Sequence, residues 1–555
     1  MHNPLLALTA ALLASPAVAD TLIDHANGIQ ADANGNLHHF TGLLIGDDGK
    51  VVRVLSEGDP RPHATTTVDA GGRTLLPGLI DAHGHVIDLG MVALTVQLTG
   101  TSSRADLQRR LATYAAAHPG KTWIIGFGWN QELWPDRRFP TAADLDAVVS
   151  DRPVMLERVD GHAIVVNSAA LKAAGVTAAT PDPAGGKIER DAGGNPTGLF
   201  VDNAKSLVQR LVPPQTPAES DEALAEAQEQ LISFGVTGIG SMSTSLDDWE
   251  TFRRAGESGR LKIRLMCYLI GEGALAAIPK PTPWLYNDRL RAVGVKLFAD
   301  GALGSRGAWL KQPYSDKRDT RGLPRHSDAE YRALAKDAAS RGFQVATHAI
   351  GDAANAEVIS TYEALSKQYG RDRRWRIEHA QIVDPADIPR LAPAGIIASM
   401  QPTHQTSDRL MAEKRLGPDR LAGAYAWNTI LKSGVHLAFG SDFPVESPNP
   451  FPGLAAAISR QDMNGQPPGG WRSQERVSFE TALAGFTREA AYASFAEDRV
   501  GALEPGKWAD FILVDRDPTK VDAQQLARTE VLETWVAGQK MWARAPSAAA
   551  TERGK

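Results

Sequence analysis

Short apolar runs alternate with longer amphipathic segments through most of the chain. Eight of the runs have the length and the Gly, Pro or polar boundaries of buried strands: TLLPGLIDAHGH, GVTGIGSM, IRLMCYLI, AVGVKLFAD, FQVATHAI, WRIEHAQ, GIIASMQP and HLAFGSD. Helix-length segments such as DEALAEAQEQLISF and DAEYRALAKDAASR lie between them. This alternation predicts parallel strands joined by crossover helices, and eight such strands favour a closed (β/α)8 TIM barrel in an α/β protein.

Both ends of the chain have a different pattern, in which short strands are broken by Gly and Asn. TLIDHANGIQ, LHHFTGLLIG and KVVRVLSEG near the start are similar in this respect to GALEPGKWADFILVDRD and TEVLETWVAGQKMW near the end. Such hairpin-rich segments are typical of β-sheet. We expect residues 20–75 and 500–545 to form one small composite β-sandwich domain, on which a barrel of residues 76–499 is mounted.

Residues 100–215 do not fit the strand count of the barrel. They contain WIIGFGWNQELWP, PVMLERVDGHAIVVNSAAL and GGKIERDAGGNPTGLF, separated by turns rich in Pro and Gly. We interpret this segment as an insertion after the first barrel strand. A position over the barrel mouth would suit a lid or a specificity region.

The first nineteen residues, MHNPLLALTAALLASPAVA, have the pattern of a secretory signal peptide. An apolar core runs from Leu5 to Leu13, and Ala17-Val18-Ala19 is a small-x-small cleavage site, although the segment before the core has no Lys or Arg. The alternative is an N-terminal membrane anchor, for which the run is too short. We therefore expect export, with a periplasmic location and no membrane attachment after cleavage.

The composition limits the classes of molecule that the chain is expected to bind. The 555 residues are 43% hydrophobic and 22% charged, with a net charge of -6 that is spread without long runs of one sign, which argues against nucleic acid or an anionic membrane as partner. Cys267 is the single cysteine, so no intrachain disulfide and no Cys-rich zinc site is expected. A small molecule is the expected partner, and a homo-oligomer remains an open alternative to a monomer.

Four histidines lie at or near the C-terminal ends of predicted strands. His83 and His85 follow PGLID two residues apart, so both side chains project on the same side of a strand. His348 and His379 end two later runs, and the C-terminal ends of barrel strands meet at one mouth. Surface histidines and hydrogen-bonded core histidines are the alternatives, but four at one mouth indicate a metal site. Imidazole suits Zn, Fe, Ni or Cu.

Asp442 ends the last predicted strand. A carboxylate at this place can bind a metal and accept a proton from a metal-activated water, which it then passes to the leaving group. The alternative is a helix N-cap, since Ser441-Asp442 precedes a turn.

Lys296 follows the apolar run AVGV. A free ammonium cannot bind a cation, so a metal role requires deprotonation or carboxylation by CO₂, and a carbamate could bridge two metals. The alternative is an ion pair with Asp300, which itself would bind substrate or anchor the turn at Gly301.

The chain resembles the amidohydrolase superfamily, specifically amidohydrolase family 3, a group similar to N-substituted formamide deformylases. The resemblance runs from Thr21 to Trp542 and rests on PGLIDAHGH, GWNQELWP, DGHAIVVNSAAL, VKLFADGALGSR, THAIGD, RIEHAQ, MQPTH, GSDFPVESPNP and LEPGKWADFILVDRDP. There is one departure: Gly240-Ser241 stand where many relatives carry His-Asp or Gly-Asp. The departure touches none of the metal positions.

The resemblance implies a distorted (β/α)8 barrel with a composite β-sandwich, and it assigns roles to named residues. It implies one or two divalent ions, with zinc expected, and metal ligands at His83, His85, His348, His379 and Asp442. Asp442 is implied as the catalytic aspartate and Lys296 as a candidate for carboxylation. Trp129, His162 and Ser305-Arg306 match positions that line the pocket of relatives, although each could equally be scaffold.

These observations favour a metal-dependent amidohydrolase that cleaves a C–N bond of an amide, an N-formyl or N-acyl compound or a cyclic amide. Deamination, lactone cleavage and ester hydrolysis are alternatives, because the same metal centre permits them. A non-catalytic periplasmic binding protein is a further alternative, but loss of catalysis should show as lost ligands, and all six core positions are intact.

Overall fold

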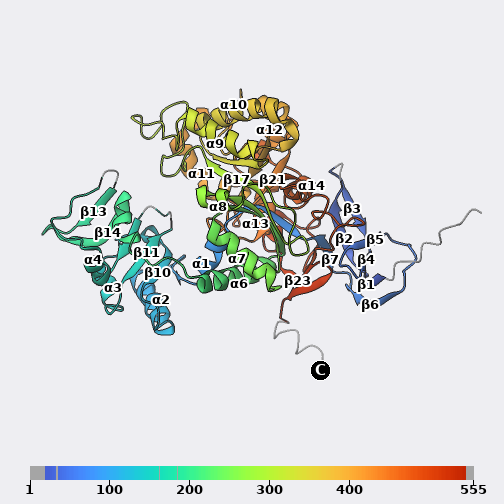
Figure 1. The fold of residues 1–555 in the computed structure, drawn as a ribbon, viewed down its shortest axis with the longest axis horizontal. Coiled ribbons are helices and arrows are strands. Elements are labelled where there is room, and N and C mark those ends of the chain that lie inside the picture. Colours follow the sequence, from blue (N-terminus) through green and yellow to red (C-terminus); the bar gives the residue numbers. More distant parts are fainter. Residues whose placement is uncertain (1–18, 33–34, 160, 162, 184–185, 546–555) are drawn as a thin grey trace, which may run out of the picture.

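The computed structural model describes residues 19–32, 35–159, 161, 163–183 and 186–545. An eight-stranded parallel sheet forms a barrel at the centre of the molecule (Figure 1). Its strands follow one another around the barrel in chain order: β8 (Leu79–Gly84), β15 (Val236–Thr244), β16 (Arg264–Leu269), β17 (Leu290–Phe298), β18 (Gln344–Ala349), β19 (Arg376–His379), β20 (Ile397–Met400) and β21 (Leu437–Phe439). The eight predicted strands are these eight, which confirms the predicted TIM barrel.

The barrel closes between its first and last strands at their C-terminal ends. The backbone N–H of Asp442 donates to the carbonyl oxygen of His83 at 2.7 Å, and that of His85 donates to Phe443 at 2.9 Å. Closure of the barrel therefore brings His83, His85 and Asp442, three of the residues expected at the site, next to one another.

Alternate residues along the strands fill the barrel, as the period of two in a strand requires. Ile80 and Ala82 on β8, with Met266 and Tyr268 on β16, belong to one buried interior cluster. The helices that accompany the barrel are α1 (Val86–Ala93), α6 (Pro217–Ser233), α7 (Leu246–Glu257), α8 (Gly271–Ala277), α9 (Asp328–Ser340), α10 (Asp352–Tyr369), α11 (Pro402–Leu416), α12 (Trp427–Lys432), α13 (Pro450–Ser459), α14 (Phe479–Gly485) and α15 (Arg488–Ala493). The alanines of α15 belong to the interior cluster.

Two further sheets lie at one end of the molecule, on the right of Figure 1. One combines both ends of the chain, in the order β24 (Gln539–Ala543), β23 (Val531–Val536), β22 (Phe511–Val514), β7 (Thr74–Pro77), β2 (Asn27–Ala31), β3 (Leu37–Phe40). The other has the order β5 (Val51–Leu55), β4 (Gly42–Gly46), β1 (Ala19–Asp24), β6 (Ala64–Asp69). The short helix α16 (Ala523–Ala527) lies between β22 and β23 in the chain.

A buried ion pair ties these sheets to the barrel. The Arg264 guanidinium, at the start of β16, binds both carboxylate oxygens of Asp510 at 2.7 and 2.9 Å. Because both side chains are almost fully buried, removing one would leave the other charge uncompensated.

The segment between α1 and α6 folds around a sheet of its own, on the left of Figure 1. The strand order is β13 (Gly186–Arg190), β14 (Pro196–Asp202), β12 (Ala163–Val166), β11 (Val154–Arg158), β10 (Ile124–Trp129), β9 (Val96–Gln97). Its helices are α2 (Arg104–Ala117), α3 (Ala142–Asp146), α4 (Ser168–Ala174) and α5 (Ser206–Gln209). Figure 1 shows most of this insertion beside the barrel, and its lid role stays a prediction.

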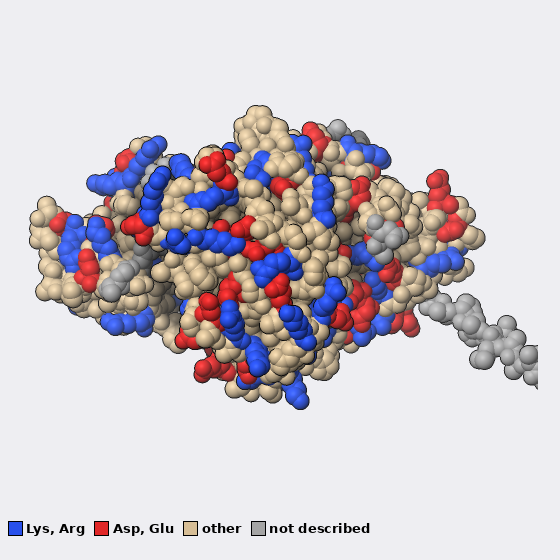
Figure 2. All heavy atoms as spheres, turned by 90° about the horizontal axis from the view of Figure 1, so that it is seen from above, with Lys and Arg blue, Asp and Glu red and all other residues tan. Residues whose placement is uncertain are grey.

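Charges of both signs are interspersed on the face shown in Figure 2. Cys267 is a free, buried thiol on β16. No helix in the described part of the chain combines the length and the apolarity needed to cross a membrane.

Candidate metal centre

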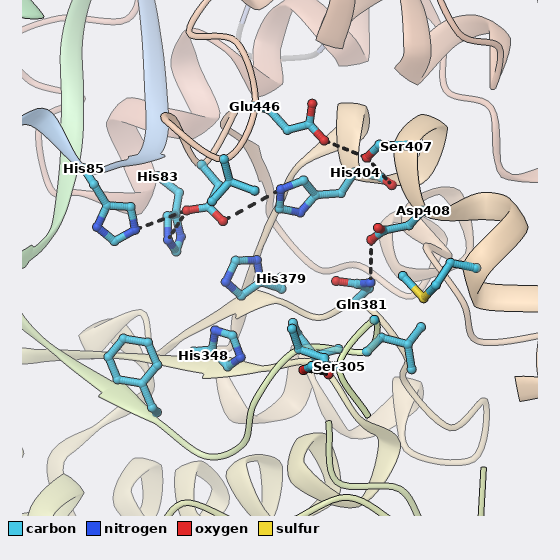
Figure 3. A pocket seen from close by; sticks show the side chains of 18 of the residues that line it. His83, His85, Ser305, His348, His379, Gln381, His404, Ser407, Asp408 and Glu446 are labelled. Atoms are coloured by element: carbon cyan, nitrogen blue, oxygen red, sulfur yellow. Dashed lines mark hydrogen bonds and ion pairs between the residues drawn. The ribbon is translucent and has the colours of Figure 1, made fainter. Parts of the chain in front are cut away.

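A cavity of about 1000 Å³ opens at the C-terminal ends of the barrel strands. All six residues predicted as the core of the site line it: His83, His85, Lys296, His348, His379 and Asp442. Figure 3 shows the labelled histidines gathered on one side of this cavity. The prediction from strand ends is therefore correct in placing these side chains together.

His83 is held in a fixed orientation by a buried carboxylate. Its Nδ1 atom lies 2.6 Å from Oε2 of Glu378, and both side chains are fully buried. Nδ1 must carry the proton in this hydrogen bond, so Nε2 presents its lone pair to the cavity. Burial, reinforced by the nearby Lys296 ammonium, lowers the pKa of His83 to about 4. His83 is therefore neutral at pH 7, as a metal ligand must be.

His379 is oriented in the same way at the end of β19. Its Nδ1 atom lies 2.8 Å from Oε1 of Gln401, which leaves Nε2 for the cavity. The backbone of His379 is left-handed, with φ 74°. Non-glycine residues rarely adopt this conformation, and those that do are concentrated at functional sites.

Asp442 lies among three imidazoles. Its Oδ1 atom is 3.4 Å from Nε2 of His83 and 3.2 Å from Nε2 of His85, and its Oδ2 atom is 3.7 Å from Nε2 of His404. Burial opposes ionisation, but the neighbouring imidazoles, His83 first, hold the pKa of this carboxyl well below its usual range. The carboxylate is thus charged and lies close to three imidazole nitrogens.

His404 and Glu378 are site residues that the sequence analysis missed. His404 lies in the first turn of α11, within the motif MQPTH, and its Nε2 atom is buried with no hydrogen-bond partner among the described residues. Glu378 precedes His379 in RIEHAQ and binds Arg376 at 2.7 Å. Burial alone would raise the pKa of Glu378, but Arg376 and His83 lower it well below its usual range. The sequence did contain a signal for Glu378: an acidic residue two positions after Arg376 in a run predicted to be a buried strand.

The donor atoms fit a divalent metal. Two sets of side chains each present ligand atoms within 4.8 Å of one another: His83, His85 and Asp442, and His379, His404 and Asp442. The unpartnered Nε2 of His404 is what a ligand position requires, and imidazole with carboxylate suits zinc and other first-row ions. Asp442 is common to both sets, and two histidines supply the other ligand atoms of each.

Two predicted ligands lie beside these sets and not in them. The Nζ atom of Lys296 is 3.2 Å from Nε2 of His83, and burial lowers the pKa of this lysine to about 8. His348 has its ring 4.6 Å from that of His379, and its Nε2 atom lies 3.5 Å from the carbonyl oxygen of Gly301. Burial also lowers the pKa of His348 to about 3, so it too is neutral.

Of the four residues expected to bind substrate, the three that the structure describes do not line the cavity. Trp129 is fully buried in the core of the insertion, and its Nε1 donates to the carbonyl oxygen of Leu156 at 2.9 Å. Arg306 pairs with Asp316 at 2.9 Å and does not line the cavity, whereas its neighbour Ser305 does. His162 lies outside the described residues.

Asp300 anchors a loop rather than facing the cavity. Its carboxylate accepts the backbone N–H groups of Trp309 at 2.8 Å, Ile350 at 3.0 Å and Gly351 at 2.8 Å. The ion pair with Lys296, considered as an alternative, is not among the contacts of these two described residues; Oδ1 of Asp300 lies 3.6 Å from Nε2 of His348 instead. Of the two roles considered for Asp300, its contacts support the structural one.

Comparison with known proteins identifies relatives along almost the whole chain. YtcJ of Bacillus subtilis (strain 168) is 34% identical over 483 residues, covering 86% of this chain and 90% of that protein. The N-substituted formamide deformylase of Arthrobacter pascens is 28% identical over 543 residues, covering 94% and 97%. The crystal structure of an uncharacterized metal-dependent hydrolase from Pyrococcus horikoshii OT3 superposes with a TM-score of 0.75 at 28% identity, covering 91% and 99%.

The family model agrees with these relatives, because it matches residues 66–541 under the description "Amidohydrolase family". With the eight-stranded barrel and the histidine and carboxylate cluster at its mouth, this match shows that the chain is a hydrolase and belongs to the amidohydrolase family.

Proposed function

We propose that this hydrolase cleaves a C–N bond of an amide, an N-formyl or N-acyl compound or a cyclic amide. The observation that carries the proposal is the place of Asp442, whose carboxylate lies 3.2 to 3.7 Å from Nε2 of three histidines at the barrel mouth. A relative named as an N-substituted formamide deformylase favours an amide as substrate over the other classes that this fold permits.

One or two divalent ions would be held by the two sets of side chains, His83, His85 and Asp442 and His379, His404 and Asp442. When bound, such an ion supplies Lewis acidity, which polarises a carbonyl group and eases the ionisation of water. Asp442 accepts the proton of the attacking water and delivers it to the leaving nitrogen, because its charged carboxylate lies at the cavity wall. We propose zinc as the ion, since the ligands are imidazole nitrogens and a carboxylate.

We also propose that Lys296 carries a carbamate. An amine reacts with CO₂ only in its neutral form and loses a proton in doing so, and burial already lowers the pKa of Lys296 to about 8. The carbamate oxygens would replace an ammonium at 3.2 Å from His83 with a group able to bind a cation. Protein incubated with ¹³C-bicarbonate should show a carbamate signal in the ¹³C NMR spectrum that a Lys296→Met variant lacks.

One experiment tests the main proposal: metal analysis of the purified protein, combined with a hydrolysis panel. The panel contains formamides, other N-acyl amides, cyclic amides, lactones, esters and amino-heterocycles. Turnover of amides that a chelator abolishes and zinc restores is the expected result. Metal-dependent turnover of lactones, esters or amino-heterocycles alone would assign the chain to one of the other reaction classes, and a protein that binds no metal would contradict both.

We propose export as well, on the basis of the first nineteen residues, of which residues 1–18 lie outside the described part of the chain. The protein recovered from the periplasmic fraction should begin near Asp20 when its N-terminus is sequenced. An uncleaved N-terminus in the cytoplasmic fraction would contradict this proposal.

A further inference from the structure

Gln381 presents an amide group to the cavity a short distance from the histidines. The residue is 4% exposed, and it lines the same cavity as His379 and Asp442. Figure 3 shows its nitrogen directed at Asp408 and its oxygen on the opposite side, toward the histidines. None of the assigned roles above uses this side chain.

The orientation of the Gln381 amide is fixed by its neighbours. Its Nε2 atom donates to Oδ2 of Asp408 at 3.1 Å and to the hydroxyl of Tyr425. The Tyr425 hydroxyl in turn donates to the same Asp408 oxygen at 2.9 Å. An ionised carboxylate only accepts hydrogen bonds, so it must face the nitrogen of the amide and not the oxygen. Both N–H bonds of Gln381 are thereby used.

The Gln381 oxygen is left as an acceptor without a partner. Among the described residues no donor reaches Oε1, and this atom faces the space in which substrate would lie. A fixed acceptor in a largely buried wall favours a ligand that brings a donor, because an unmatched polar group costs about 1–3 kcal/mol on desolvation.

The backbone also holds Gln381 rigidly. His379 and Ala380 are both left-handed, with φ 74° and 42°, so the chain turns sharply after β19. The backbone N–H of Tyr425 then donates to the carbonyl oxygen of Gln381 at 2.7 Å. The amide therefore has little freedom to rotate away from the cavity.

We propose that Gln381 is a specificity-determining residue that accepts a hydrogen bond from an N–H group of the substrate. The site then favours amides whose nitrogen carries a hydrogen over N,N-disubstituted amides and esters, which have no donor at that position. Asp408 and Tyr425 act as positioning residues, since they fix which end of the Gln381 amide faces the substrate. This inference rests on the proposed amide hydrolysis.

The test compares two substrates in several variants. The pair is the secondary amide that the wild-type protein hydrolyses fastest and its N-methyl analogue, and the measured quantity is the ratio of their kcat/KM values. In Gln381→Met the ratio should fall about three- to tenfold, the range expected for one lost hydrogen bond. The loss should come from the secondary amide, with kcat/KM for the N-methyl analogue almost unchanged.

Asp408→Asn tests the fixed orientation without touching Gln381. An asparagine side chain offers N–H groups as well as an oxygen, so it can face either end of the Gln381 amide. The amide then no longer has one fixed orientation, and the ratio of the two kcat/KM values should again fall. Gln30→Met is the matched control: Gln30 is also buried, but it lies on β2 and bonds the backbone of Leu503, far along the chain from the site. It should leave the ratio unchanged.

Metal content and circular dichroism establish that each variant is folded. An unchanged ratio in folded Gln381→Met overturns the inference, and if that variant does not fold, an unchanged ratio in Asp408→Asn overturns it. Wild-type protein that hydrolyses no amide contradicts the proposed function itself, so the two failures are distinguishable. A wild-type preference for the N-methyl analogue also overturns the inference.

Discussion

The Nδ1 atom of His83 lies 2.6 Å from Oε2 of Glu378 in the interior of the barrel. Arg376 binds the same carboxylate through Nε at 2.7 Å and Nη2 at 3.1 Å. Arg376 keeps Glu378 charged, and Glu378 fixes the proton of His83 on Nδ1, so that Nε2 is available at the cavity. One strand, β19, thereby supplies both His379 and the group that orients His83 on β8.

Replacing Glu378 by Gln should weaken metal binding about 10- to 100-fold, the usual effect of losing a carboxylate that orients a ligating histidine. Competition with a chromogenic chelator measures this change. The variant should also unfold more readily, because the buried Arg376 charge loses its partner. Glu489→Gln is the control: it removes the carboxylate of an exposed His436 pair at 2.7 Å. Equal metal affinity in the two variants would contradict the role given to Glu378.

Asp442→Asn should keep much of its metal and lose turnover by about 10²–10⁴-fold, the contribution of a positioned acid–base group. An amide has the same shape as the carboxylate, but it cannot accept and return the proton. Metal content by elemental analysis and kcat on the best substrate are the two measurements. Near-normal kcat with full metal content would exclude Asp442 as the proton carrier.

In the metal-free protein, the buried histidines should reduce the stability as the pH falls below about 6.5. Burial lowers the pKa of His83 to about 4 and that of His348 to about 3, whereas in the unfolded chain both have the ordinary value of about 6.5. Between about pH 6.5 and 4 each of these histidines therefore binds a proton in the unfolded state but not in the folded state, and its contribution to the free energy of unfolding decreases as the pH falls. The buried carboxyls of Asp81 and Asp300 act in the opposite direction, because burial raises the pKa of each to about 7. Urea unfolding of chelator-treated protein at several pH values measures the slope.

A His348→Asn variant should show a shallower slope in the same window, because one titrating group is gone. If the wild-type protein and His348→Asn show the same slope between about pH 6.5 and 4, His348 is not neutral in the folded state as proposed.

The barrel could be predicted from sequence because each of its strands is a local apolar run between breakers. The bounds are less predictable: β21 keeps only Leu437–Phe439 of the run HLAFGSD. After it, the chain bends to place Asp442 in the left-handed region with φ 61°. That bend is set by closure of the barrel against β8, which is a contact between distant parts of the sequence.

Glu378 and His404 were not predicted as site residues for a similar reason: their roles depend on contacts between distant parts of the chain. In a strand, neighbouring side chains point to opposite faces, so Glu378 and His379 are not expected to serve one site. The left-handed backbone of His379 and the curvature of the barrel make this arrangement possible. His404 could not be predicted for a further reason, since it lies inside α11 rather than at the end of an apolar run. Its role depends on where that helix begins relative to the barrel mouth.

Trp129 shows the limit of transferring a role by resemblance, and it leads to a last prediction. The side chain packs in the core of the insertion, with its ring 6.2 Å from that of Phe139 in an edge arrangement. Trp129→Ala should therefore destabilise the insertion by about 3–5 kcal/mol, the usual cost of removing a buried aromatic side chain.

Trp129→Phe keeps most of the packing and should leave KM within about twofold, because the side chain does not reach the cavity. Phe298→Leu is the comparison, since Phe298 lines the cavity and its loss should change KM. A large KM change in Trp129→Phe with unchanged thermal stability would show that Trp129 does contribute to substrate binding.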